Sequence, residues 1–448
     1  MKELKYLLFS VCILFAGCDP EIEVPNEITS GTADFSNYIA VGNSLTAGYA
    51  NRGLYETSQL TSFPNLLAQQ MQVAGGGDFK QPIMEGNGSG YLYLSALIND
   101  SILGLVPVID SAQANQAAFS KVEGPVNNYG IPGLRAKDVA TPGYATVNPY
   151  LGRLLADQEL MKTYTQVIEE QEATFFTCWL GNNDILNYAA PDGEPGTGIY
   201  VLTPVEEFSV RFSDMMAAFG DAKGVVLTIP DILVSPLFTT IPKTLIPITN
   251  QEDADQLNAG YADYNEGVDL YNSQVPEDKK INRIEFSVGL NYPVVVDKSI
   301  PFPEPGKISQ LKEGHLLLNI PRENLISKGW GTREPIPDQY ALTKAEIDSI
   351  HSRISAYNAI IRSFESANVA VVETNELIQK VAQGMLINGA PVNATYINGS
   401  VFSLDGAHLT PRGNALLANE VIKVINAKFN ASLPPLPVTM YKGIDLPQ

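Results

Sequence analysis

The residues of this sequence that could carry out acyl transfer are a serine and a histidine with an aspartate close by. Ser44 follows a short apolar run, residues 38–41 (Tyr-Ile-Ala-Val), and then Gly42. Asp405 precedes His408 by three positions, so its carboxylate can accept a hydrogen bond from the imidazole Nδ1–H and leave Nε2 free as a base. A hydroxyl at the end of a buried strand can act on a ligand, but Ser is also a favoured helix cap. Taken alone, Ser44 therefore fits two roles, nucleophile or cap.

Two further polar stretches follow apolar segments. Residues 126–133 (Val-Asn-Asn-Tyr-Gly-Ile-Pro-Gly) predict a short strand and a glycine loop ahead of a helix that begins near Leu134. Residues 174–180 predict a buried strand, and residues 181–184 (Gly-Asn-Asn-Asp) follow at its carboxyl end. Glycine N–H groups and Asn amides can point at a ligand, although such glycines usually make only a turn and Asn and Asp often close loops. Their meaning depends on whether they lie beside Ser44.

Apolar strands alternate with helices along most of the chain. Two more buried strands are expected at residues 224–229 and 368–372, and a long amphipathic helix at roughly 150–172. The helix before the last strand is the clearest, because Thr343 and Glu346 form a capping box ahead of an apolar stripe. This alternation predicts an α/β fold with a parallel, three-layer α/β/α arrangement.

Two segments interrupt the alternation. Residues 74–124 are too long for a simple connection and predict mixed helical and loop structure. Residues 235–341 are rich in Pro, Asn and Gly, with one expected helix at 251–273, and could form a cap over the site. We therefore expect a catalytic domain over residues 34–430 with these two insertions, followed by a C-terminal tail at 431–448.

The amino terminus has the features of an export signal. Residues 1–18 contain two lysines, an apolar core too short to span a bilayer as a mature helix, and Ala16-Gly17 ahead of Cys18. This segment resembles a bacterial lipoprotein signal peptide, in which Cys18 is lipidated; a plain secretory signal is the alternative. Residues 19–33 are acidic and proline-containing and predict a tether. Either reading predicts export to the cell envelope, and lipidation predicts an outer-membrane lipoprotein.

Composition argues against several other kinds of partner. A net charge of −20 is unsuited to binding nucleic acid, which requires a basic surface. Of the three cysteines only Cys178 would remain as a free thiol in the mature chain, so no disulfide is expected within it. The two other histidines, His315 and His351, are distant in sequence from His408 and from any cysteine cluster. We expect no metal and no organic cofactor.

Four stretches, taken in order, resemble the sequence blocks of the SGNH hydrolases, also called GDSL esterases and lipases. That family is named for a Ser, a Gly, an Asn and a His, each in its own block. The corresponding stretches here are residues 42–46 (Gly-Asn-Ser-Leu-Thr), 128–133, 181–184 and 405–408. One departure is Asn43, where the first block usually has Asp; Asn can make the same local hydrogen bonds without the charge.

The resemblance implies a flavodoxin-like parallel sheet and a catalytic triad of Ser44, His408 and Asp405. It also implies that the oxyanion of the reaction would be bound by the Ser44 N–H, the Gly130 N–H and the Asn183 side-chain amide. The expected activity is the hydrolysis of acyl esters through a covalent acyl-enzyme intermediate.

The expected substrates are acyl esters of lipids or acylated glycans, and nothing in the sequence chooses between them. A lipid anchor would provide the only contact with the membrane. Two alternatives belong to other classes of protein. One is a non-catalytic, ligand-binding envelope lipoprotein that retains the fold, and the other is a structural envelope protein. A missing triad residue would favour the binding protein, but all three candidates are present.

Overall fold

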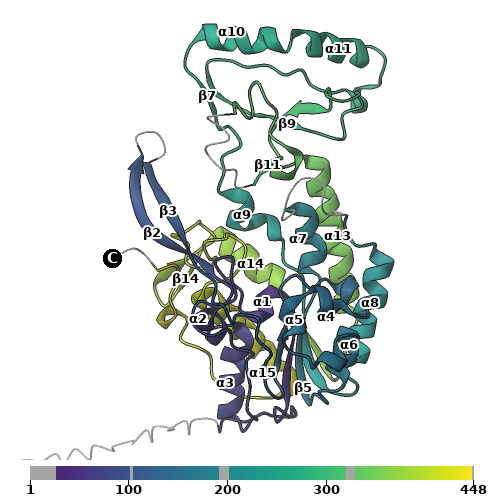
Figure 1. Cartoon of the computed structure of the whole chain (residues 1–448), viewed down its shortest axis with the longest axis vertical. Helices are drawn as coiled ribbons and strands as arrows, with labels where there is room; N and C mark the ends of the chain where they lie inside the picture. The colour runs from purple at the N-terminus through teal and green to yellow at the C-terminus, as the bar shows by residue number, and fades with distance from the viewer. Residues whose placement is uncertain (1–26, 101–103, 191–200, 319–327, 446–448) are drawn as a thin grey trace, which may run out of the picture.

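A five-stranded parallel sheet forms the centre of the protein in the computed structural model, which describes residues 27–100, 104–190, 201–318 and 328–445 (Figure 1). The strand order is β13-β6-β5-β1-β4, and all four pairings are parallel. In order along the chain this is the 2-1-3-4-5 arrangement of flavodoxin-like folds, which confirms the predicted fold class. The strands are β1 (Tyr38–Gly42), β4 (Asn128–Gly130), β5 (Phe175–Trp179), β6 (Lys223–Leu227) and β13 (Val369–Val372).

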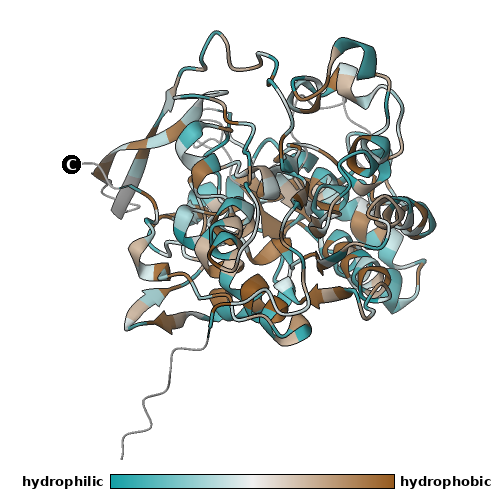
Figure 2. Ribbon diagram, turned by 90° about the horizontal axis from the view of Figure 1, so that it is seen from below, coloured by the Kyte–Doolittle hydropathy of each residue, from teal (hydrophilic) through white to brown (hydrophobic). Residues whose placement is uncertain are grey.

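Successive strand residues pack on opposite faces of the sheet, because side chains alternate along a strand. Ile39 and Val41 of β1 belong to one hydrophobic cluster, whereas Tyr38 and Ala40 belong to another. The strands of the sheet are therefore apolar on both faces, as expected for parallel strands covered by helices. Figure 2 shows the helices placed around this sheet, with hydrophobic segments concentrated toward the middle of the molecule.

Helices cover each face. On one side lie α6 (Tyr164–Glu169), α8 (Val205–Ala217) and α13 (Lys344–Arg362), and on the other lie α3 (Phe63–Val73) and α15 (Pro411–Phe429). The N-terminus of α13 is capped as predicted, since the Thr343 hydroxyl accepts from Glu346 N–H and the Glu346 carboxylate accepts from Thr343 N–H.

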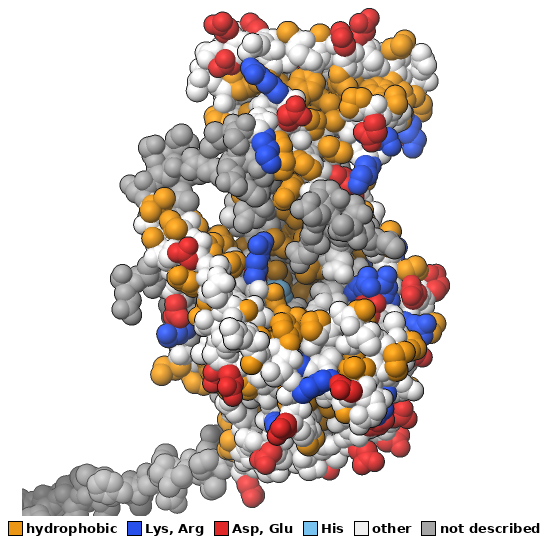
Figure 3. Space-filling model, in the orientation of Figure 1, with side chains coloured by type: hydrophobic (Ala, Val, Ile, Leu, Met, Phe, Trp, Pro, Cys, Tyr) orange, Lys and Arg blue, Asp and Glu red, His pale blue; other side chains and the backbone are white. Residues whose placement is uncertain are grey.

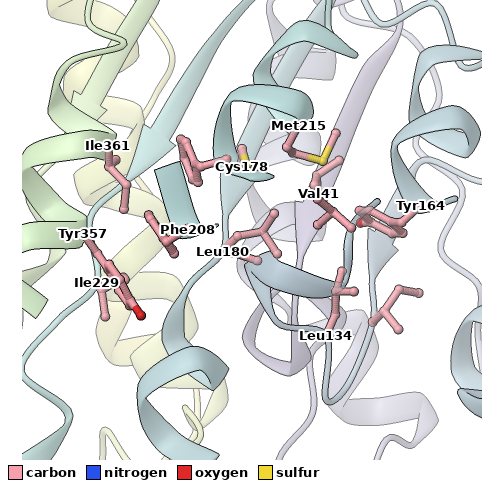
Figure 4. Packing of buried hydrophobic residues seen from close by; sticks show 14 of the residues in the cluster. Val41, Leu134, Tyr164, Cys178, Leu180, Phe208, Met215, Ile229, Tyr357 and Ile361 are labelled. Carbon is pink, nitrogen blue, oxygen red and sulfur yellow. The ribbon is translucent and has the colours of Figure 1, made fainter. Parts of the chain in front are cut away.

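Aromatic stacking joins two of these helices. The rings of Phe208 on α8 and Tyr357 on α13 stack 3.9 Å apart at 10°, within the cluster shown in Figure 4. Both side chains are fully buried, and Cys178 of β5 lies in the same cluster. Burial raises the pKa of the Cys178 thiol far above its ordinary value, so it stays a neutral packing group.

The long helix predicted at 150–172 is wrong, because this segment breaks into three short pieces. They are α5 (Pro149–Gly152), a 3-10 turn (Asp157–Glu159) and α6. A new capping box starts the last piece, with Thr163 and Gln166 bonding each other's backbone N–H groups. The helical spacing of apolar residues did not reveal these local caps.

The segment 74–124 contains a hairpin rather than the predicted mixture of helix and loop. Strands β2 (Tyr91–Asp100) and β3 (Gly104–Ala112) pair antiparallel, with an irregularity between Leu94 and Ala96. Runs such as Tyr-Leu-Tyr-Leu favour strands, and the two strands satisfy each other's backbone groups. The hairpin projects from the body in Figure 1, and Tyr91 stacks on Tyr55 at its base, with ring centroids 4.1 Å apart.

Residues within 235–341 form a separate small lobe with hydrophobic clusters of its own. The single helix predicted at 251–273 is two, α10 (Gln251–Gly260) and α11 (Ala262–Asn272), because Tyr261 leaves helical geometry between them. The Tyr261 hydroxyl donates to the Thr332 carbonyl, which ties this break to the rest of the lobe. Figure 1 places the lobe beyond α7 (Asn182–Ala189) and α9 (Pro236–Thr239), on the side of the sheet where α1 (Ser44–Ala47) follows β1. The strands of the lobe are β7 (Ile246–Ile248), β8 (Gly289–Asn291), β9 (Val294–Val296), β10 (Ile308–Gln310), β11 (Leu316–Leu317) and β12 (Ala341–Leu342).

The chain after α15 packs back on the body. Leu433, Leu436 and Val438 are buried in the cluster that also contains side chains of α3 and α15.

The predicted signal segment, including Cys18, lies outside the described residues. Within the described ranges no helix has the length and apolar character needed to cross a membrane. The remaining helices and strands are α1 (Ser44–Ala47), α2 (Glu56–Leu60), α4 (Tyr144–Val147), α7 (Asn182–Ala189), α9 (Pro236–Thr239), α14 (Thr374–Gln383), β14 (Met385–Ile387) and β15 (Ala390–Val392).

Candidate active site

Ser44 lies where strand β1 turns into the short helix α1. Asn43 caps this helix, since its Oδ1 accepts a hydrogen bond from Leu45 N–H at 3.0 Å. The cap role that the sequence left open for Ser44 therefore belongs to Asn43. Ser44 is the first helical residue, and no acceptor for its N–H is found among the described residues. Its position beyond β1, next to β5, is the point where the strand order reverses and where α/β sheets bind ligands.

The structure brings Ser44, His408 and Asp405 together in one chain of hydrogen bonds. His408 Nε2 lies 2.8 Å from Ser44 Oγ, and His408 Nδ1 lies 3.0 Å from Asp405 Oδ2. Because an ionised carboxylate can only accept, Nδ1 carries the proton and Nε2 is left to accept the Ser44 O–H. The imidazole is also packed against the ring of Tyr49, with centroids 4.8 Å apart. Oriented in this way, the imidazole can act as a base toward the Ser44 hydroxyl.

Asp405 is held as a carboxylate by its neighbours. Burial alone would raise its pKa, but the charge of His408 and four hydrogen bonds outweigh burial and hold the pKa well below its ordinary value. Oδ1 accepts from Ala407 N–H and His408 N–H, while Oδ2 accepts from Arg52 N–H and His408 Nδ1–H. The carboxylate is therefore charged at every pH at which the histidine could act as a base.

A tight turn that sequence reasoning missed holds the Asp405 loop against the serine segment. Ala50 and Gly53 exchange two backbone hydrogen bonds, and both central residues, Asn51 and Arg52, have positive φ (54° and 60°) as a type I′ turn requires. Three hydrogen bonds connect this turn with the loop: Asn51 N–H to Ser403 Oγ, Leu404 N–H to Asn51 Oδ1, and Arg52 N–H to Asp405 Oδ2. The Asn-Arg-Gly sequence at 51–53 was the available signal.

Asn183, the predicted oxyanion donor, lies in the first turn of α7 and lines the same cavity as Ser44. Its Nδ2 donates to the Leu134 carbonyl at 3.0 Å. A primary amide has two hydrogens on this nitrogen, so one remains for a ligand. The neighbouring Asn182 also lines the cavity, and both of its side-chain polar atoms are buried without a partner among the described residues.

The prediction for Gly130 does not agree with the structure. Its N–H already donates to Asn128 Oδ1 at 2.8 Å, and an added Cβ would collide with the Ala47 backbone, so this glycine serves close packing. Gly133, three residues later, has φ +83° and no acceptor for its N–H among the described residues. The adjoining Leu134 carbonyl is the group that Asn183 binds, which places Gly133 beside the Asn183 amide along the chain.

Asp184 anchors α7 to the loop that follows this glycine. Its carboxylate accepts from Ala136 N–H and from the Thr203 hydroxyl. The helix predicted to begin near Leu134 does not form. Only a short 3-10 turn (Ala136–Asp138) is found there, and its first N–H is bonded to Asp184. Burial raises the pKa of Asp184 to about 6, against the opposing effect of its hydrogen bonds.

The other two histidines lie apart from this site. His315 is in the lobe and is partly buried. On α13, His351 Nε2 lies 3.3 Å from Asp231 Oδ2. In the part of the chain that the structure describes, no three His, Cys, Asp or Glu side chains are grouped so that they could hold a metal ion.

A family comparison gives this geometry a context. Residues 38–290 match the model of the GDSL-like lipase/acylhydrolase family, which is more than half of the chain. The chain belongs to this family. No curated protein shows a significant match. The GDSL match confirms the suspected SGNH relationship, and it supports a lipase- or esterase-type acyl hydrolase at that level of detail.

The residues that match the GDSL model include Ser44 and Asn183, but the match ends before Asp405 and His408. The tertiary structure supplies these last two residues, from the loop that leads into α15. The GDSL segment and the C-terminal segment thus form one site only in the folded chain.

Proposed function

We propose that this protein is an exported serine ester hydrolase that uses Ser44 as its nucleophile. The observation that carries the proposal is the continuous hydrogen-bond chain from Ser44 Oγ through the His408 ring to the Asp405 carboxylate. Such a chain lets a hydroxyl lose its proton as it attacks a carbonyl carbon. The GDSL family match supports the same class of reaction.

Each step of the reaction follows from the position of the histidine. His408 Nε2 takes the proton of Ser44 as its oxygen bonds to the ester carbonyl carbon, and Asp405 stabilises the imidazolium that results. The tetrahedral intermediate then breaks down: the alcohol departs with the proton from His408, and the acyl group remains as an ester on Ser44. Water then attacks in the same way, with His408 as base, and releases the acid and free Ser44. No cofactor, metal ion or nucleic acid takes part.

We assign the binding of the oxyanion to three N–H donors. The Ser44 N–H and the Gly133 N–H have no acceptor in the described part of the chain, and Asn183 has one amide hydrogen to spare. Donors of this kind, fixed in place before the reaction, stabilise charge that appears only in the transition state. Gly133 replaces Gly130 in this role because the Gly130 N–H is already bonded.

The direct test uses purified protein with p-nitrophenyl esters and with a fluorophosphonate reagent that phosphonylates activated serines. We expect hydrolysis of the esters, and a mass increase on the peptide that contains Ser44. A protein that hydrolyses no ester and takes up no reagent would instead support the non-catalytic binding alternative.

Asn183→Ala should lower kcat by about 10²- to 10³-fold with little change in KM, because the amide stabilises only the transition state. If Asn183 merely closed a turn, the same change would lower stability by about 1 kcal/mol and leave kcat intact. The measurements are kcat, KM and Tm on the one variant.

The matched control for Asn183→Ala is Asn265→Ala in the lobe. Asn265 is similarly buried and donates to the Ile284 carbonyl at 2.9 Å, but it lies outside the cavity that Ser44 lines. It should lower Tm without lowering kcat. A loss of kcat that is equal in the two variants would argue against an oxyanion role for Asn183.

We further propose that the protein is anchored in the outer membrane through lipid on Cys18. Cys18→Ala should release it into the soluble fraction while leaving ester hydrolysis unchanged, because the anchor makes no contribution to the triad. Cys12→Ala, a cysteine within the same signal segment, is the control and should remain in the membrane fraction. A wild-type protein that fractionates as fully soluble would contradict the anchor.

A further inference from the structure

The triad opens into a cavity that is apolar over most of its lining. Ser44 and His408 are among the residues that line it. Small-molecule sites are mainly apolar with a few placed polar groups. In Figure 3 the surface between the lobe and the body is hollowed, and hydrophobic side chains line much of that hollow.

Aliphatic and aromatic side chains from five separate parts of the chain make up the wall. They come from α1, from residues 179–186, from residues 230–238, from α14, and from residues 401–417. Representative members are Leu186, Ile232, Phe238, Ile378 and Leu416. Because distant segments converge on one empty apolar space beside the nucleophile, the cavity belongs to the reaction site and is not a packing defect within a single layer.

Two of the polar residues of the cavity are direct chain neighbours of Ser44 and Asn183. Asn43 and Asn182 line it, both at least nine-tenths buried, and the Asn43 Nδ2 and both Asn182 polar atoms have no partner among the described residues. An unpaired buried amide is costly, so these groups are suited to receive a polar atom of a ligand. Two other polar lining residues are already engaged, since Thr374 donates to the Thr228 carbonyl and Asp231 accepts from Leu233 N–H.

The charged side chains of the lining disfavour an anionic ligand. Among the described residues that line this cavity there is no Lys or Arg, whereas the acidic Asp231 does line it. An anionic group such as a phosphate or a sugar acid would therefore find no cation there. The lining matches a ligand with one polar end at Ser44 and a long apolar remainder.

We propose that this cavity is the binding site for the acyl chain, so that the substrates are esters of medium- to long-chain aliphatic acids rather than acetyl esters. This inference rests on the proposed function, because the acyl group occupies the cavity while it is bonded to Ser44. An acetyl group would leave nearly all of the apolar wall exposed to water, whereas each added methylene that is buried strengthens transition-state binding by up to about fourfold.

The test is kcat/KM for p-nitrophenyl acetate, butyrate, octanoate and dodecanoate, measured below the micelle-forming concentration of each ester. For the wild type we expect octanoate to exceed acetate by about tenfold or more. Ile378→Trp, which fills part of the cavity from a half-buried position on α14, should lower kcat/KM for octanoate about tenfold and leave that for acetate within about twofold.

Ile360→Trp is the matched control, since Ile360 is also half-buried on a helix, α13, but does not line the cavity. It should leave the chain-length profile unchanged. If Ile378→Trp fails to fold, as its Tm would show, the wild-type profile and binding of the neutral amide decanamide to the Ser44→Ala variant by calorimetry still decide the matter. We expect decanamide to bind there and acetamide not to bind.

Each outcome has a distinct meaning. A wild type that hydrolyses acetate as well as octanoate, or an Ile378→Trp loss that is equal for both esters, overturns the acyl-chain site and leaves the ester hydrolase intact. If the protein turns over no ester in a Ser44-dependent way, the proposed function is overturned, and the acyl-chain site is overturned with it.

Discussion

Ser44→Ala is expected to lower kcat for ester hydrolysis by about 10⁶-fold, the scale seen when the serine of a triad is removed. The Ser44 hydroxyl forms the covalent bond to the acyl group, and the Ala methyl group has no lone pair to attack with. Residual turnover should come only from water positioned by His408 and the oxyanion donors. The measurement is the steady-state rate at saturating substrate, together with the loss of fluorophosphonate labelling.

The fold should survive this change. The Ser44 hydroxyl has one bonded partner in the described chain, His408 Nε2. Ser58→Ala is the control, because Ser58 on α2 is buried to a similar extent and its hydroxyl bonds only Tyr55 among the described residues. It should cost about 1 kcal/mol of stability and leave kcat unchanged. If Ser44→Ala retained wild-type turnover at an unchanged Tm, the nucleophile would have to be another group.

Asp405→Asn should lower kcat by about 10⁴-fold, the effect found when a triad aspartate becomes an amide. If the Asn oxygen keeps the bonds to Ala407 N–H and His408 N–H, its NH₂ group faces His408 Nδ1 and Arg52 N–H. The imidazole must then accept at Nδ1 and carry its proton on Nε2, which is the wrong tautomer for taking the proton of Ser44.

The matched control is Asp297→Asn in the lobe, where a buried carboxylate accepts from Ser299 and Ser309. It should leave kcat unchanged.

The pKa of Asp405 is lowered in the folded protein. The contribution of this carboxylate to stability is therefore fully present above the pKa of the unfolded carboxyl and is lost only as pH falls toward the folded value. Asp405 should therefore remain a carboxylate in mild acid and continue to stabilise the fold there, as near-UV circular dichroism can check.

Much of the sheet was predictable because its strands are locally marked. Residues 38–41, 174–180, 224–229 and 368–372 are short, apolar and β-branched or aromatic, and each overlaps a strand of the central sheet. The helix after Thr343 was equally clear, since its cap and its apolar stripe agree. Where local signals and burial point the same way, the sequence predicts the element correctly.

Elements that depend on capping side chains or on a pairing strand were predicted less well. The segment 150–172 has helical spacing, but local caps divide it into short pieces. The hairpin of β2 and β3 was missed because each strand is stabilised mainly by the other across the loop, a pairing that periodicity in one strand does not report.

In the candidate site, the sequence by itself determined which chemical groups are available and two of their local relationships. The Asp405 and His408 side chains meet because they are three positions apart on one loop, and Ser44 follows its strand directly. Only the tertiary structure decided that His408 reaches Ser44, which is 364 positions away in the chain, and that the turn at Asn51 and Arg52 holds the two segments together.

The tertiary structure also decided which glycine N–H is available and what surrounds the nucleophile. Gly130 and Gly133 are alike in sequence, but the Gly130 N–H donates to Asn128 Oδ1, whereas the Gly133 N–H has no acceptor in the described chain. The apolar cavity is assembled from five separated segments, so no local pattern predicts it. The physical reason is the same in both cases. Residue type and spacing determine what a side chain can do within a few positions, whereas hydrogen-bond partners and empty space are properties of groups that only folding brings together.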